Sequence, residues 1–325
     1  MRCSQAEHAK RTGSAPSDAP QKWGLLPACD RPESGQTARM RFALFVSLAL
    51  LATGAHTLAD EGVSPVPDFI RTGFQLQPFY QKCILIEGFP IVASAKTNDA
   101  AVAESAVIVR GMLAGRNDIL ASLAKEHIRL TVMACSERTC DVPEHADLTP
   151  KEYWNRRARG LGATKERPSV SCAEENVLCC KGDPYSTENI LVHEFAHAIH
   201  IIGLEKVNPT FDERLKKTYE ASIASGKWKN CYAAENHAEY WAEAVQSWFG
   251  TNRENDAIHN HVNTRDELKA YDPEVAKLCA EVFGDNNWQY RRADDPARKS
   301  EPHLKNLDRE KLPVFEWSDA EKKQP

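Results

Sequence analysis

Residues 186–203 read Ser-Thr-Glu-Asn-Ile-Leu-Val-His-Glu-Phe-Ala-His-Ala-Ile-His-Ile-Ile-Gly, and this stretch decides the interpretation of the chain. The pattern predicts a helix capped by Ser186 or Thr187 and ended by the final glycine. Positions 190–202 are apolar apart from the histidines and Glu194, so the helix should be largely buried. Buried imidazoles and a buried carboxylate are costly unless a partner satisfies them, and a metal ion would do so.

The segment His193-Glu194-Phe195-Ala196-His197 supplies two histidines four residues apart. On a helix these imidazoles lie on one face, one turn from each other, and can hold one Zn²⁺ ion with Glu194 beside them. A catalytic zinc has three protein ligands and a fourth position open to water. A third ligand must therefore lie elsewhere in the chain.

The metzincin pattern does not supply this third ligand, because it needs Gly at position 200 and His at position 203, whereas the chain has His200 and Gly203. A carboxylate on a second helix is the other common solution, and apolar spacing predicts a helix over 236–249. Three glutamates recur at four-residue spacing near one face of that helix. They are Glu235, Glu239 and Glu243, and geometry alone admits each of them.

The segment Tyr-Ala-Ala-Glu-Asn-His-Ala-Glu-Tyr-Trp-Ala-Glu-Ala, residues 232–244, resembles the third-ligand helix of gluzincins related to the catalytic domain of anthrax lethal factor. The His-Glu-Phe-small-His motif of that family is matched as well. The resemblance implies that Glu239 binds zinc and that Tyr232, seven residues earlier, stabilises the reacting oxygen. It does not extend upstream of the first motif's helix, and His237 replaces an acidic neighbour of the ligand.

These residues predict separate roles in the hydrolysis of a peptide bond. Zinc would activate water, and Glu194 would act as the general base that takes the water proton and delivers it to the leaving amine. Tyr232 would donate a hydrogen bond to the developing oxyanion, unless it is an ordinary packing residue. Glu243, one turn after Glu239, is placed to orient a ligating histidine, the alternative being a solvated or ion-paired side chain.

The region before residue 186 predicts an α+β fold. Cys83–Glu87 and Ile91–Ala95 read as a hairpin, 99–125 as a helix with a break near Gly115, and Ile128–Ala134 as a strand. The fold expected is a two-lobed, zincin-like metallopeptidase with a small sheet beside the active-site helix and a mainly helical C-terminal lobe. The resemblance further implies that substrate lies along the sheet edge, with the strand near Ile128–Ala134 as the candidate platform.

Residues 136–186 are rich in Pro, Gly, Cys and charge and are expected to form long loops. Eight cysteines follow the leader, an even number that predicts disulfides in an exported chain, with a Cys135–Cys140 pair as one example. A structural zinc site is the alternative for three of them, although their spacing fits no standard pattern. They are Cys172, Cys179 and Cys180.

The N-terminal region predicts export. Met40-Arg41 precedes an apolar run too short to span a bilayer and then small residues, the pattern of a signal peptide over 40–59. Met40 is the expected true start, which makes residues 1–39 a mis-called upstream extension, and cleavage is expected after Ala59 or, as second choice, Ala55. The protein would then be secreted or periplasmic.

The remainder divides into a catalytic domain over 60–300 and a charged C-terminal tail over 301–325. The chain is 42% hydrophobic and 27% charged, the balance of a soluble globular protein, and residues 60–325 carry a net charge of −8. That acidic balance disfavours a nucleic-acid partner, so the expected partner is a protein or peptide substrate. The oligomeric state does not follow from the sequence.

Three functions are compatible with the zinc helix. The first is an exported zinc peptidase. The second is a zinc-dependent hydrolase of a non-peptide amide, since the same zinc and glutamate serve that chemistry. The third is an envelope protein without catalytic activity whose fold is stabilised by zinc. Glu194 disfavours this reading, because a structural zinc site does not need a general base.

Overall fold

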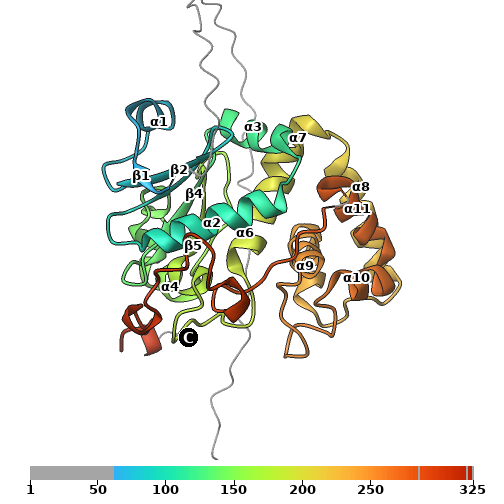
Figure 1. Cartoon of the computed structure of the whole chain (residues 1–325). Coiled ribbons are helices and arrows are strands. Elements are labelled where there is room, and N and C mark those ends of the chain that lie inside the picture. The colour runs from blue at the N-terminus through green and yellow to red at the C-terminus, as the bar shows by residue number, and fades with distance from the viewer. Residues whose placement is uncertain (1–61, 285, 320, 324–325) are drawn as a thin grey trace, which may run out of the picture.

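The computed structural model describes residues 62–284, 286–319 and 321–323, so the predicted leader and signal peptide lie outside the described residues. The first half of the described chain is built on a five-stranded sheet of order β1-β2-β3-β4-β5 (Figure 1). The strands are β1 (Ser64–Pro65), β2 (Lys82–Ile86), β3 (Phe89–Ala93), β4 (Arg129–Met133) and β5 (Ser169–Ala173).

The predicted hairpin is present, because β2 and β3 pair antiparallel around Glu87 and Gly88. Both turn residues have positive φ, which glycine adopts without strain. The strand pairs β3–β4 and β4–β5 are parallel, so β4 is an interior strand. The long helix predicted before β4 is α2 (Asp99–Met112) and α3 (Asn117–Lys125), interrupted near Gly115 as expected.

The second half of the chain is mainly helical. After α4 (Lys151–Arg157) and α5 (Glu174–Val177), the helices are α6 (Ile190–Ala198), the π-helix Ile199–Gly203, α7 (Leu204–Val207), α8 (Phe211–Ala224), α9 (His237–Phe249), α10 (Arg265–Tyr271) and α11 (Pro273–Phe283). Helix α6 packs against β5 on one side and α9 on the other (Figure 1). The predicted α+β class, with a sheet beside the motif helix and a helical second part, is confirmed.

Side-chain caps fix the start of both motif helices. The Asn189 side chain accepts a hydrogen bond from the Val192 amide, so α6 begins later than the predicted caps at Ser186 and Thr187. The Asn236 side chain accepts from the amides of residues 238 and 239 and starts α9. These caps fix where α6 and α9 begin.

The region predicted as loops before residue 186 contains more regular structure than expected. Strand β5 pairs along its whole length with β4, and all five of its residues are buried. Its sequence, Ser-Val-Ser-Cys-Ala, is short and contains only one strongly apolar residue, Val170, so the pattern did not reveal it.

The expected disulfides are not formed, because all eight described cysteines are free. Cys135 and Cys140 are both buried, as are Cys83, Cys172, Cys180 and Cys279, and such thiols pack as small apolar side chains. The candidate metal-binding groups among the described residues contain no cysteine, which also leaves the alternative cysteine zinc site without support.

The segment after α11 returns from the helical half to the sheet side of the molecule (Figure 1). Just before the expected tail, Arg298 forms a buried bidentate ion pair with Glu104 of α2. Within the expected tail, Phe315 is 3% exposed, and its amide donates a hydrogen bond to the carbonyl of Lys181. Part of the segment expected as a tail is therefore packed on the first half of the chain. Among the described residues, no helix combines the length and the apolar character needed to cross a membrane.

Candidate metal centre

Helices α6 and α9 bring together His193, His197 and Glu239. Nε2 of His193 lies 3.2 Å from Nε2 of His197 and 3.1 Å from Oε2 of Glu239, and Nε2 of His197 lies 3.4 Å from that oxygen. A tetrahedral zinc with bonds of about 2.0–2.2 Å has its ligand atoms about 3.3–3.6 Å apart. The three atoms thus form a triangle of the size that one zinc ion requires.

The donor set also fits zinc chemically. The three residues are only 1–3% exposed, and both imidazoles direct Nε2 at the same carboxylate oxygen. Imidazole nitrogen and carboxylate oxygen are the ligands of His₂Glu catalytic zinc sites. A fourth protein ligand would be typical of a structural site, whereas this group has three members.

The pKa values of the two carboxyl groups in the centre are shifted in opposite directions. Burial opposes ionisation of Glu239, yet the neighbouring His197 and His193 lower its pKa to about 2. Burial raises the pKa of Glu194 above the ordinary glutamate value, partly offset by the same two imidazoles. Glu239 is therefore the carboxylate suited to bind a cation, and Glu194 the one suited to exchange a proton.

The hydrogen-bond acceptor behind His193 is a residue that the sequence did not indicate. Nδ1 of His193 lies 2.8 Å from Oε1 of Gln246, whereas Oε1 of Glu243 is 3.7 Å away. Glu243 instead accepts a hydrogen bond from Asn252 and lies 3.5 Å from His259. The sequence does hint at this role, because Gln246 is a polar residue two turns after Glu239 on a helix that is buried along most of its length.

The Tyr232 ring lies beside His193, with ring centroids 6.3 Å apart and planes within 29°. Its hydroxyl is buried and has no hydrogen-bond partner among the described residues. Burial raises the pKa of this phenol far above its ordinary value, so the hydroxyl keeps its proton and can donate it in a hydrogen bond. Glu235, by contrast, is exposed and precedes α9, away from the triangle of ligand atoms.

The strand expected as the substrate platform is not at an edge of the sheet. The predicted platform, β4, lies between β3 and β5 and has no free edge, so that expectation is wrong. Leu161 forms an antiparallel bridge with Ser171 of β5. A Cβ atom added at Gly162 would lie 3.1 Å from Cβ of His197 and 3.4 Å from Oε2 of Glu194, so the backbone here runs close over α6.

Comparison with known proteins finds similarity among solved structures. No family model and no curated protein matches the chain. A solved structure of the Pro-Pro endopeptidase PPEP-2 from Paenibacillus alvei superposes with a TM-score of 0.42 and 17% sequence identity, over 59% of this chain and 97% of that one. A similarity of this degree does not assign the chain to a family, so the functional argument depends on the centre itself.

Proposed function

We propose that the chain is a zinc-dependent peptidase whose metal is held by His193, His197 and Glu239. The observation that carries the proposal is the buried triangle of ligand atoms, with edges of 3.1–3.4 Å, on a helix that also carries Glu194. When bound, zinc would supply a Lewis acid for the scissile carbonyl and the attacking water.

The residues of the chain would divide the proton transfers. Glu194, whose pKa is raised by burial, would take the proton of the attacking water and deliver it to the leaving amine. Tyr232, whose protonated hydroxyl is otherwise unpartnered among the described residues, would donate a hydrogen bond to the developing oxyanion. Gln246 would hold the orientation of His193.

A peptide substrate is supported by the strand arrangement beside the centre. The segment bridged to β5 at Leu161 passes close to Glu194 at Gly162, which places backbone that is bridged to the sheet next to the proposed general base. An extended peptide binds such backbone through strand-like hydrogen bonds. A non-peptide amide would gain less from this edge.

We also propose that the protein acts outside the cytoplasm, as a secreted or periplasmic enzyme. The support is the signal-peptide pattern that begins at Met40. Sequencing the N-terminus of the protein recovered outside the cytoplasm would test this: a start near Asp60 or His56 supports it, and retention of the segment from Met40 contradicts it.

Cleavage of an unfolded protein such as casein tests the peptidase proposal. The unmodified chain should cleave casein, while Glu194→Gln should bind zinc equally and lose cleavage by at least about 10²-fold. Glu220→Gln, at an exposed position of α8, is the matched control and should keep full activity. Equal zinc content without cleavage by the unmodified chain would contradict peptidase activity and favour the non-peptide amide or structural alternatives.

A further inference from the structure

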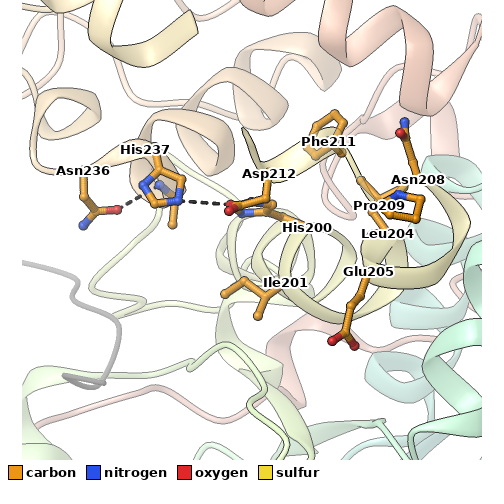
Figure 2. Close-up of a pocket in the computed structure, with 11 residues that line it drawn as sticks. His200, Ile201, Leu204, Glu205, Asn208, Pro209, Phe211, Asp212, Asn236 and His237 are labelled. Atoms are coloured by element: carbon orange, nitrogen blue, oxygen red, sulfur yellow. Dashed lines mark hydrogen bonds and ion pairs between the residues drawn. The ribbon is translucent and has the colours of Figure 1, made fainter. Parts of the chain in front are cut away.

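A second group of ligand-type side chains lies close in sequence to the candidate metal centre. Nε2 of His200 is 2.8 Å, and Nε2 of His237 is 3.2 Å, from the same carboxylate oxygen of Asp212. One ligand atom from each residue lies within 4.8 Å of the other two. Figure 2 shows the three side chains gathered on one wall of a pocket. The group repeats the two-imidazole, one-carboxylate composition of the first centre.

Three separate elements position this group. His200 belongs to the π-helix Ile199–Gly203, Asp212 to the first turn of α8, and His237 is the first residue of α9. A π-helix is rare and is frequently found at functional sites, because the extra residue in the turn re-aims side chains. Here the π-turn directly follows the motif helix α6 and carries His200 to the pocket wall.

The His200 ring is nearly fully buried, and its polar contact is with Asp212 of this group. Its other nitrogen, Nδ1, is buried and has no hydrogen-bond partner among the described residues. Asp212 and His237 are more accessible, with side chains 65% and 33% exposed. A site with one buried and two accessible ligands can exchange an ion with solvent.

The pocket beside the group has a volume of about 420 Å³. Its remaining wall is mainly apolar and includes Ile201, Leu204 and Phe211 (Figure 2). Glu205 also lines it, but its carboxylate is 2.6 Å from the ammonium of Lys165. The pocket therefore leaves room for water or an exogenous ligand on an ion bound by the three residues.

We propose that His200, Asp212 and His237 form a second divalent-cation site, for zinc or a similar ion that prefers imidazole ligands. Calcium and magnesium require mainly oxygen ligands, which this group does not offer. The atom separations of 2.8 and 3.2 Å are hydrogen-bond distances, shorter than the roughly 3.3–3.6 Å expected around a tetrahedral zinc, so the accessible side chains of Asp212 and His237 would move apart slightly to admit the ion. Bound there, the ion would tie the π-helix to α8 and α9, next to His197 and Glu239.

Zinc content per chain tests the second site. The full chain, dialysed to equilibrium against micromolar zinc and then desalted, should retain two zinc ions, and Asp212→Asn or His237→Ala should retain one. Both positions are accessible, so these variants should fold, and their thermal unfolding would show it. The matched controls are Glu213→Gln, at the exposed neighbour of Asp212, and His261→Ala, at another exposed histidine. Both should retain two zinc ions.

A Glu239→Gln background separates this inference from the proposed function. One zinc in that variant, falling to none when Asp212→Asn is added, supports both sites. One zinc in the unmodified chain and still one in Asp212→Asn overturns the second site while leaving the first. Two zinc ions in Glu239→Gln that fall to one with Asp212→Asn keep the second site and contradict the proposed first one. The absence of zinc from the unmodified chain overturns both.

Discussion

Nδ1 of His193 lies 2.8 Å from Oε1 of Gln246, a residue two helical turns beyond Glu239 on the same helix. Helix α9 therefore provides both the Glu239 carboxylate, which would bind the ion, and the Gln246 oxygen, which accepts a hydrogen bond from the opposite nitrogen of His193. This contact assigns His193 the tautomer with its proton on Nδ1, which leaves Nε2 free to bind a metal.

Replacing Gln246 with Ala should therefore weaken zinc binding about 10- to 100-fold, because His193 loses its orienting acceptor. Competition with a chromophoric chelator measures this affinity. Gln81→Ala, at an exposed site, is the control, and equal affinities for it and for Gln246→Ala would refute the positioning role.

Removing the hydroxyl of Tyr232 should lower kcat, whereas removing that of Tyr240 should lower stability. Tyr232→Phe removes a buried hydroxyl with no partner among the described residues, so kcat should fall about 10²- to 10³-fold with little loss of stability. Tyr240→Phe removes a hydrogen bond to buried Asp272, so unfolding in urea should show a loss of about 1–3 kcal/mol with kcat retained. Unchanged kcat in Tyr232→Phe would make that residue a packing tyrosine.

Acid should destabilise the fold partly through His145. Burial lowers the pKa of this histidine to about 4, whereas an unfolded histidine has a pKa near 6.5. Between these values the unfolded state binds a proton that the native state does not. The contribution of neutral His145 to the unfolding free energy is thus complete above about pH 6.5. It is lost as the pH falls toward 4, and the loss is on the order of 3 kcal/mol.

Urea unfolding at pH 7 and at pH 4.5 checks this contribution. The difference in unfolding free energy between the two pH values should shrink in His145→Gln and stay unchanged in His261→Gln, whose side chain is exposed. The same pH dependence in the unmodified chain and in His145→Gln would rule out this histidine as a cause.

The C-terminal segment should contribute to stability through Phe315. This ring is 3% exposed and receives the guanidinium of Arg159 at 4.7 Å from its centroid. Phe315→Ala should cost about 3–5 kcal/mol of unfolding free energy, and Val314→Ala, at a neighbour that is 54% exposed, less than about 0.5 kcal/mol. Similar small values for both variants would mean that the segment is not needed for folding.

The elements that the sequence predicted well are those with local signals. The hairpin of β2 and β3 is marked by two apolar runs on either side of Gly88, and the helices α2, α6 and α9 by apolar periodicity and caps. Helix α8 was missed because most of its surface is charged and exposed. Strand β5 was missed because it is short, contains only one strongly apolar residue and lies in a region rich in Pro, Gly and charge.

For the candidate centre, the spacing of His193 and His197 could be predicted because it depends on one helix. From spacing alone, Glu239 was one of three possible carboxylates, and the resemblance to gluzincins favoured it. Gln246 and Asp212 could not be predicted, because their contacts depend on how α9 and α8 pack against α6 and the π-helix. Hydrophobic periodicity and capping patterns do not predict packing between helices that are distant in the sequence.

The proposed peptidase activity depends most on zinc being held by His193, His197 and Glu239. Diffraction measured above and below the zinc absorption edge, from crystals grown with zinc, locates the ion directly. We predict an anomalous peak within about 2.2 Å of both Nε2 atoms and of a Glu239 carboxylate oxygen. Zinc peaks found only at other residues, with these three side chains bonded to one another instead, would contradict the account.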